Sequence, residues 1–313
     1  MFSPAGVVGV RPTRAEAFAP GHVTGLFAPS RSGRDPRSHG SVGAGLVLPL
    51  GVTALAELWP STRSSIRIES DAGQELPISR EVALRLLRGR RGALSVRLHH
   101  ELPIGQGFGM SAAGALATAL AVGEVVHAPR STAIATAHLA DLFGRGGLGG
   151  VSAILGGGME LRTRPGIPPW GAIEHSPFPW PIFVIVVGSP MPSRALLADA
   201  EVARRATRSA APGLGRLGER ATPEGFLRES ERFTDAVGLA DRPLASAIRR
   251  LRGSGARVAQ AMFGRSLFAV PLSGAARDRL AGALAVGELR GVELRAARSG
   301  ARLRSLPPGP TPR

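Results

Sequence analysis

The residues best suited to chemistry stand in a glycine-rich segment between Pro103 and Leu116, where glycines at alternating positions precede Ser111. An alternating apolar stretch leads into the segment, and a run rich in Ala and Leu, typical of a helix over about residues 111–126, leads out. Backbone N–H groups of such a loop converge on an anion, and the helix N-terminus adds the positive end of its dipole. The hydroxyl in the first helical turn can reach a phosphate oxygen or Mg²⁺. The pattern predicts a phosphate-binding loop made of Gly105, Gly107, Phe108, Gly109, Met110, Ser111 and Ala112.

Two common nucleotide-binding fingerprints do not fit this loop. A Walker loop ends in Gly-Lys-Ser or Gly-Lys-Thr, whereas this chain contains no Lys. A dinucleotide-binding loop requires an acidic residue that closes a βαβ unit, and no clear candidate follows here. Arg side chains or backbone N–H groups would therefore bind any phosphate. The alternative interpretation is a glycine-rich turn that only packs a strand against a helix.

A second candidate group is the pair His138 and Asp141, which stand three residues apart in an expected helix over 132–143. Residues at this spacing share a helix face. An imidazole and a carboxylate beside a phosphate loop are suited to binding Mg²⁺ and a substrate. From spacing alone, an exposed pair on a solvated face is the favoured alternative.

The elements that must position these residues are a mixture of strands and helices. Residues 17–41 favour a strand, a turn and a functional loop, and the loop over 144–150 is again rich in glycine. A cap at Ser131 or Thr132 is expected for the helix that carries His138. Periodicity predicts further strands over 45–57, 64–69, 93–102 and 159–163, and further helical segments over 79–88 and 151–155.

The Pro- and Trp-containing stretch Pro165 to Pro181 is expected to break regular structure, and it marks a domain boundary near residue 170. We therefore expect domains over 1–170 and 171–304 and a disordered tail over 305–313. The run Ile182 to Val187 is the best signal for a buried strand. Mixed elements of this kind indicate the α+β class. The remaining expected helices cover 193–209, 223–237, 243–251 and 275–286, and the remaining strands cover 257–263, 266–271 and 292–295.

Composition excludes some classes of function. The chain of 313 residues has no Cys, so disulfides and thiolate chemistry are excluded. No stretch reaches the roughly 18 apolar residues of a membrane span, and a cytoplasmic enzyme with no membrane partner is the default. The formal net charge of +16 raises nucleic-acid binding as an alternative. Because the Arg residues are spread along the chain, we favour a compositional bias and expect no nucleic-acid partner.

Four segments carry a resemblance to a known family. The sequence LPIGQGFGMSAAGALATALA is similar to the second conserved motif of the GHMP kinase superfamily, in the version found in archaeal pantoate kinases. The other segments, which resemble the same family and follow in the same order, are FAPGHVTGLFAP with GSVGAGLVL, AHLADLFGRGGLGGV, and QAMFGRSLFAV. Together they extend from about residue 17 to 270.

The resemblance implies a two-domain GHMP kinase fold. Its N-terminal, ATP-binding domain would be similar to the second domain of ribosomal protein S5, and its C-terminal domain would be ferredoxin-like. ATP and the substrate would bind between them. The implied activity is an ATP-dependent pantoate kinase, which transfers the γ-phosphoryl group to the primary hydroxyl of pantoate and yields 4-phosphopantoate for coenzyme A biosynthesis. The protein could be a monomer or a homodimer, and the resemblance does not decide between them.

The same resemblance implies roles for individual residues. Ser111 and Asp141 would be the catalytic pair that holds Mg²⁺, with Asp141 at a position where the family has Glu. The segment around His22 and Thr24 would line the substrate cavity. Residues that would bind pantoate are Ser30, His138, Arg162 and Ser193.

One position departs from the family pattern. The motif Gly-Leu-Gly-Asp-Val reads Gly147-Leu148-Gly149-Gly150-Val151 here, so Gly150 replaces the expected catalytic Asp. A general base contributes about 10²–10⁴-fold, and its loss would slow phosphoryl transfer without abolishing it. Glu160 is a candidate substitute. The alternatives are a GHMP kinase for another small alcohol, or a catalytically degenerate member that binds nucleotide or RNA.

Overall fold

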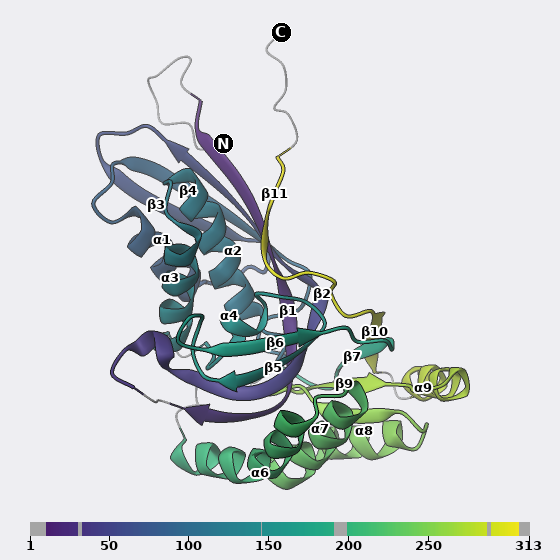
Figure 1. Ribbon diagram of the computed structural model, residues 1–313. Coiled ribbons are helices and arrows are strands. Elements are labelled where there is room, and N and C mark those ends of the chain that lie inside the picture. Colours follow the sequence, from purple (N-terminus) through teal and green to yellow (C-terminus); the bar gives the residue numbers. More distant parts are fainter. Residues whose placement is uncertain (1–10, 31–32, 145, 191–198, 287–288, 307–313) are drawn as a thin grey trace.

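The computed structural model describes residues 11–30, 33–144, 146–190, 199–286 and 289–306. Two sheets organise this part of the chain, and they form two lobes (Figure 1). The larger sheet has strand order β11-β1-β2-β4-β3, with β5 paired to β2 and β6 paired to β5. Its strands are β1 (Thr13–Ser30), β2 (Gly40–Trp59), β3 (Ser64–Ser70), β4 (Gly92–His100), β5 (Met159–Arg164), β6 (Ala172–Ser176) and β11 (Arg302–Arg304).

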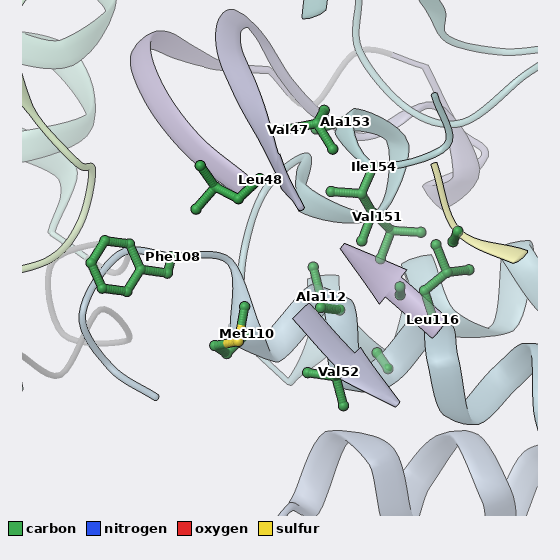
Figure 2. Close-up of a cluster of buried hydrophobic side chains, with 14 of the residues drawn as sticks. Val47, Leu48, Val52, Phe108, Met110, Ala112, Leu116, Val151, Ala153 and Ile154 are labelled. Atoms are coloured by element: carbon green, nitrogen blue, oxygen red, sulfur yellow. The ribbon is translucent and has the colours of Figure 1, made fainter. Parts of the chain in front are cut away.

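Helices of the first lobe pack together beside the long strands β1 and β2 (Figure 1). The central helix α2 (Met110–Val125) is almost entirely Ala, Leu, Gly and Val and is buried nearly all round, as expected for a helix without a polar face. Its small side chains allow close packing against β1, β2, α1 (Pro77–Leu87) and α3 (Arg130–Phe143). The short helix α4 (Gly150–Ala153) lies beside the start of α2, where Val151 and Ile154 join the same core cluster as Ala112 and Leu116 (Figure 2).

The second lobe contains an antiparallel sheet of order β10-β7-β9-β8. Its apolar strands β7 and β9 are buried because both faces are covered. Phe226 of α7 stacks on Phe268 of β9 at a ring distance of 6.0 Å. The elements of this lobe are β7 (Ile182–Val186), α6 (Ala200–Glu219), α7 (Pro223–Val237), α8 (Arg242–Arg252), β8 (Arg257–Gln260), β9 (Ser266–Val270), α9 (Gly274–Val286) and β10 (Arg290–Leu294).

The chain returns to the first lobe after β10. Strand β11 pairs antiparallel with β1 (Figure 1). The segment before it is also attached, since the Ala297 N–H donates to the Val47 carbonyl and the Ala301 N–H donates to the Ile154 carbonyl. The larger sheet is therefore completed by residues from the C-terminal end of the described chain.

The α+β class and most expected elements are confirmed, and helix α7 matches its expected bounds. Three expectations are wrong. The helix expected over 193–209 does not end at 209, since α6 continues through Pro212 to Glu219. The stretch 165–181 contains strand β6, because its residues continue the sheet beyond β5. Helix α3 begins at Arg130, since Pro129 occupies the N-cap in place of Ser131 or Thr132. The division near residue 170 stays a prediction. In the described parts of the chain, no helix combines the length and apolarity that a membrane crossing requires.

Candidate active site

A cavity of about 310 Å³ brings together residues from distant parts of the sequence. Strand β1 contributes His22 and Thr24, and β5 contributes Arg162. The glycine-rich loop before α2 forms another part of the wall, and residues 262–263 of the second lobe close it. The expected phosphate-binding loop and the expected substrate-binding arginine therefore face one space.

The backbone of the glycine-rich loop requires its glycines. Gly105, Gly107 and Gly109 have φ values of +79°, +78° and +70°, in the left-handed region that side chains rarely adopt. Gly107 also approaches the second lobe closely, because a Cβ there would lie 2.6 Å from the Ala261 carbonyl oxygen. Glycine at this position thus meets both a conformational and a steric requirement.

Both lobes anchor the loop. The Gln106 side-chain amide donates to the Gly188 carbonyl at 2.6 Å, and the Ser266 hydroxyl donates to the Gln106 carbonyl. From the first lobe, the His22 N–H donates to the Phe108 carbonyl at 2.9 Å. The Phe108 and Met110 side chains are buried (Figure 2). The loop is held in place while its cavity-facing backbone is left to bind a ligand.

Ser111 and Asp141 meet at the cavity wall, as the family resemblance implies. The Ser111 hydroxyl donates to Asp141 Oδ1 at 2.8 Å. Asp141 is only 2% exposed, and this burial raises its pKa to about 6 despite the hydrogen bond from Ser111. The backbone at Gly146 lies so close to both groups that a side chain there would collide with them. The second glycine-rich loop therefore closes over the pair.

Arg162 and Glu160 form a buried ion pair, and His22 joins it. Arg162 Nη1 donates to Glu160 Oε1, and His22 Nε2 lies 2.9 Å from the same oxygen. Burial opposes the charge of Glu160, but Arg162 and His22 outweigh it and hold the pKa of Glu160 below its usual value. Burial lowers the pKa of His22, which is therefore neutral at neutral pH. Arg162 Nε has no hydrogen-bond partner, although it is buried.

Two of the expected substrate residues, His138 and Ser30, are not among the residues that line this cavity. His138 is buried on α3, the helix that packs against the 3₁₀ turn η1 (Pro36–Ser38), and it does not line the cavity. Burial lowers the pKa of His138. Ser30 ends β1 opposite Gly40 and also lies outside the lining residues. Ser193 lies outside the described residues.

Sequence reasoning missed the apolar part of the wall and the ion network. Ile78 lines the cavity from α1, which no motif links to it, and the segment QAMFGRSLFAV contains Met262 and Phe263 without indicating that they face the cavity. The contact between His22 and Glu160 joins residues 138 positions apart. One available signal was the pair of glycines in GSVGAGLVL, Gly43 and Gly45, across which these side chains meet.

The oxygen atoms at this site are suited to a hard cation such as Mg²⁺, which also keeps water and phosphate ligands. Among the described residues, no group of three or more His, Cys, Asp or Glu side chains is placed to hold a metal ion. Mg²⁺ is commonly bound by one or two protein oxygens, with waters and substrate phosphates completing its octahedron. Ser111 Oγ and Asp141 fit that mode, since the buried carboxylate has no positive partner among the described residues.

Comparison with known proteins shows which family the chain belongs to. Residues 78–158, which include the glycine-rich loop, match the model of the GHMP kinases N terminal domain. A pantoate kinase from Methanospirillum hungatei is 35% identical over 204 residues, which cover 63% of this chain and 68% of the relative. A pantoate kinase from Thermococcus kodakarensis is 31% identical over 242 residues, which cover 75% of this chain and 80% of the relative. The chain belongs to the pantoate kinase family of the GHMP superfamily.

A solved structure extends the pantoate kinase comparison to the whole fold. The structure described as a phosphotransferase related to the coenzyme A biosynthesis pathway superposes with a TM-score of 0.84 at 26% identity. The superposition covers 93% of this chain and 99% of that structure. The expected GHMP kinase fold is confirmed.

Proposed function

We propose that this protein is an ATP-dependent pantoate kinase, which transfers the γ-phosphoryl group to the primary hydroxyl of pantoate and forms 4-phosphopantoate for coenzyme A biosynthesis. The observation that carries the proposal is the convergence of the glycine-rich loop, the Ser111–Asp141 pair and Arg162 on one cavity. Family membership and the two curated relatives support the same activity.

The phosphates of ATP would bind at the loop before α2. Its backbone N–H groups and the N-terminus of α2 supply partial positive charge without a lysine. Ser111 in the first turn of α2 would contact a phosphate oxygen. Hydrogen bonds from both lobes keep the loop in one conformation before ATP binds, which lowers the entropy lost on binding.

Ser111 and Asp141 would hold Mg²⁺. When bound, Mg²⁺ supplies positive charge that neutralises the phosphate oxygens during transfer. The shorter side chain of Asp141, compared with Glu in the family, is buried and oriented by the Ser111 hydroxyl. This contact keeps the carboxylate at the cavity wall.

Arg162 would orient the carboxylate of pantoate. A guanidinium can bind a carboxylate through two parallel hydrogen bonds. Arg162 lines the cavity, and its Nε still lacks a partner. Glu160 takes up Nη1 and fixes the plane of the guanidinium. The acceptor hydroxyl would then lie between Arg162 and the phosphate loop. Ser30, His138 and Ser193 remain proposals for the outer part of the substrate site.

We also propose a cytoplasmic location, because ATP and pantoate are metabolites of the cell interior. Nucleic acid is not a proposed partner, since many arginines are already paired, for example Arg216 and Arg232 with Glu229. A homodimer is a proposal that size-exclusion chromatography with light scattering would test.

The proposal is tested by a coupled assay of purified protein with Mg²⁺, ATP and D-pantoate. We expect turnover in the wild type and a loss of about 10²-fold or more in Ser111→Ala. If folded wild-type protein transfers no phosphate to pantoate, the assignment is wrong. A panel of other small alcohols would then separate a GHMP kinase of different specificity from a degenerate nucleotide-binding member.

A further inference from the structure

Three side chains form a hydrogen-bonded series at the cavity wall. Thr24 Oγ1 lies 3.4 Å from His22 Nδ1, and His22 Nε2 lies 2.9 Å from Glu160 Oε1. Thr24 and His22 line the cavity, whereas Glu160 is completely buried. An acid, an imidazole and a hydroxyl in this order are the arrangement in which a histidine accepts a proton from a hydroxyl group.

A glycine between the strands makes this series possible. Strand β2 separates β1 from β5, and Gly45 of β2 is paired with Thr24 on one side and Glu160 on the other. A side chain at Gly45 would collide with the imidazole ring of His22. Because residue 45 lacks a side chain, His22 can reach across β2 to Glu160.

The charges determine the direction of each hydrogen bond. Arg162 holds Glu160 in its ionised form, so the carboxylate accepts a hydrogen bond from His22 Nε2–H. In a neutral imidazole the other nitrogen is then an acceptor. His22 Nδ1 accepts from the Thr24 hydroxyl, which leaves the lone pairs of Thr24 Oγ1 free to accept from a cavity ligand. The 3.4 Å contact is long, but such bonds commonly tighten when substrate binds.

The series also lies beside the phosphate-binding loop. The His22 N–H donates to the Phe108 carbonyl at 2.9 Å. A Cβ on Gly109 would lie 3.2 Å from His22 Cβ, so the two backbones are in contact. An acceptor hydroxyl positioned for attack on a phosphate held by this loop is therefore close to the same wall as Thr24.

We propose that Thr24, His22 and Glu160 form a proton relay that receives the hydroxyl proton of the acceptor alcohol during phosphoryl transfer, in place of the carboxylate that Gly150 lacks. The relay deepens the proposed function and rests on it. Thr24 is the catalytic residue of the three because it would touch the substrate. His22 receives the proton, and Glu160 is a positioning residue that stabilises the protonated ring.

The step balances without another reactant. The acceptor oxygen forms a bond to the γ-phosphorus while the bond to the bridging oxygen breaks, and that electron pair leaves on ADP. The acceptor's proton passes to Thr24 Oγ1 as the proton of Thr24 passes to His22 Nδ1. The imidazolium faces the Glu160 carboxylate and returns its proton to solvent when the products leave.

Charged groups from two strands act on the His22 ring. Glu160 and Arg162 approach from β5, and His175 acts on His22 from β6. Strand β2 presents only Gly45 at the ring, and the loop before α2 presents backbone at Phe108 and Gly109. Burial, Arg162 and His175 lower the pKa of His22 while Glu160 raises it, so Nδ1 is unprotonated at neutral pH and Glu160 is the group that stabilises the ring when it takes the proton.

The decisive variant is Thr24→Val, which keeps the shape of the side chain and removes the hydroxyl. We expect kcat to fall by about 10²-fold while KM for ATP is unchanged, since a general base contributes about 10²–10⁴-fold. Thr24→Ser restores the hydroxyl and should stay within a few-fold of the wild type. Thr207→Val on the exposed face of α6 is the matched control and should not change kcat. If Thr24→Val keeps kcat within twofold, or raises only KM for pantoate, the relay is wrong.

A second measurement does not depend on the substrate. ¹⁵N NMR of the histidine ring, assigned with His22→Gln, reports which nitrogen carries the proton. We expect the neutral tautomer protonated at Nε2. A ring protonated at Nδ1 cannot accept from Thr24 and would overturn the relay even in an active enzyme. If wild-type protein is inactive towards pantoate, the proposed function fails, and Thr24→Val is then measured with the alcohol that the substrate panel identifies.

Discussion

Gly150 and Ala112 face each other so closely that a Cβ on residue 150 would lie 2.6 Å from the Cβ of Ala112. The contact joins the first residue of α4 to the first turn of α2, where Ala112 belongs to the core cluster of Figure 2 and Gly150 lines the cavity. An aspartate therefore cannot be placed at this position by one substitution without moving a helix. The absent carboxylate and the methyl group of Ala112 are structurally coupled.

Gly150→Asp alone should destabilise the protein by about 1–3 kcal/mol, because overpacking a close-packed contact costs this much. Ala112→Gly should remove the clash, so the double variant should recover part of the stability, less about 1 kcal/mol for glycine within a helix. Urea unfolding of the wild type, both single variants and the double variant gives the coupling energy. Additive effects would show that Ala112 does not restrict position 150.

Asp141→Asn should stabilise the fold at neutral pH while it removes activity. The native protein keeps the Asp141 proton up to a pKa of about 6, whereas the unfolded chain releases it near the ordinary pKa of 3.8. Between these values the native state binds more protons, so this group lowers stability as pH rises. Above about pH 6, the ionised Asp141 carboxylate lowers the free energy of unfolding by about 3 kcal/mol at most.

Chemical denaturation at two pH values checks this expectation. Asp141→Asn should have a higher free energy of unfolding than the wild type at neutral pH. The difference should disappear below about pH 4, where residue 141 is uncharged in both proteins. Mg²⁺ should raise the Tm of the wild type and not that of Asp141→Asn. A variant that is less stable than the wild type at neutral pH would contradict the buried, uncompensated carboxylate.

Arg162→Met should unfold more easily and bind pantoate more weakly. Removing one partner of a buried ion pair costs about 3–5 kcal/mol because the other charge stays buried. Adding Glu160→Gln neutralises that charge, and the double variant should recover most of the stability. KM for pantoate should remain raised by about 10- to 100-fold in both variants, since hydrogen bonds between charged groups contribute about 1.5–3 kcal/mol. An unchanged KM would remove Arg162 from the substrate site.

Gly107→Ala should impair ATP binding beyond its effect on stability. Both Gly107 and Gly89 have positive φ, at +78° and +74°. A Cβ on Gly107 would meet the Ala261 carbonyl, whereas a Cβ on Gly89 would meet nothing within 4 Å. Each substitution should cost about 1–2 kcal/mol for the backbone conformation. Only Gly107→Ala should raise KM for ATP, as steady-state kinetics would show. Equal kinetics of the two variants would mean that the loop does not hold phosphate.

The local part of this structure could be predicted from the sequence. Periodicity and glycine spacing are short-range signals, so α2, α7 and the loop before α2 follow from them. Strand β6 was missed because apolar and polar residues alternate only weakly over Ala172–Ser176 and the segment stands among prolines. Its pairing with β5 makes it a strand. The family resemblance supplied Arg162, but the contact of its partner Glu160 with His22 depends on strand pairing across Gly45, which no local pattern encodes.

The return of the chain from β10 to β11 has a mechanical consequence. Two covalent connections, over residues 177–181 and 295–301, join the larger sheet to the smaller one. The two lobes are also packed together, because α6 and α7 contact β1 and one hydrophobic core contains residues of both lobes. A cut in either connection should therefore leave the two lobes attached to each other, through the second connection and through this shared core.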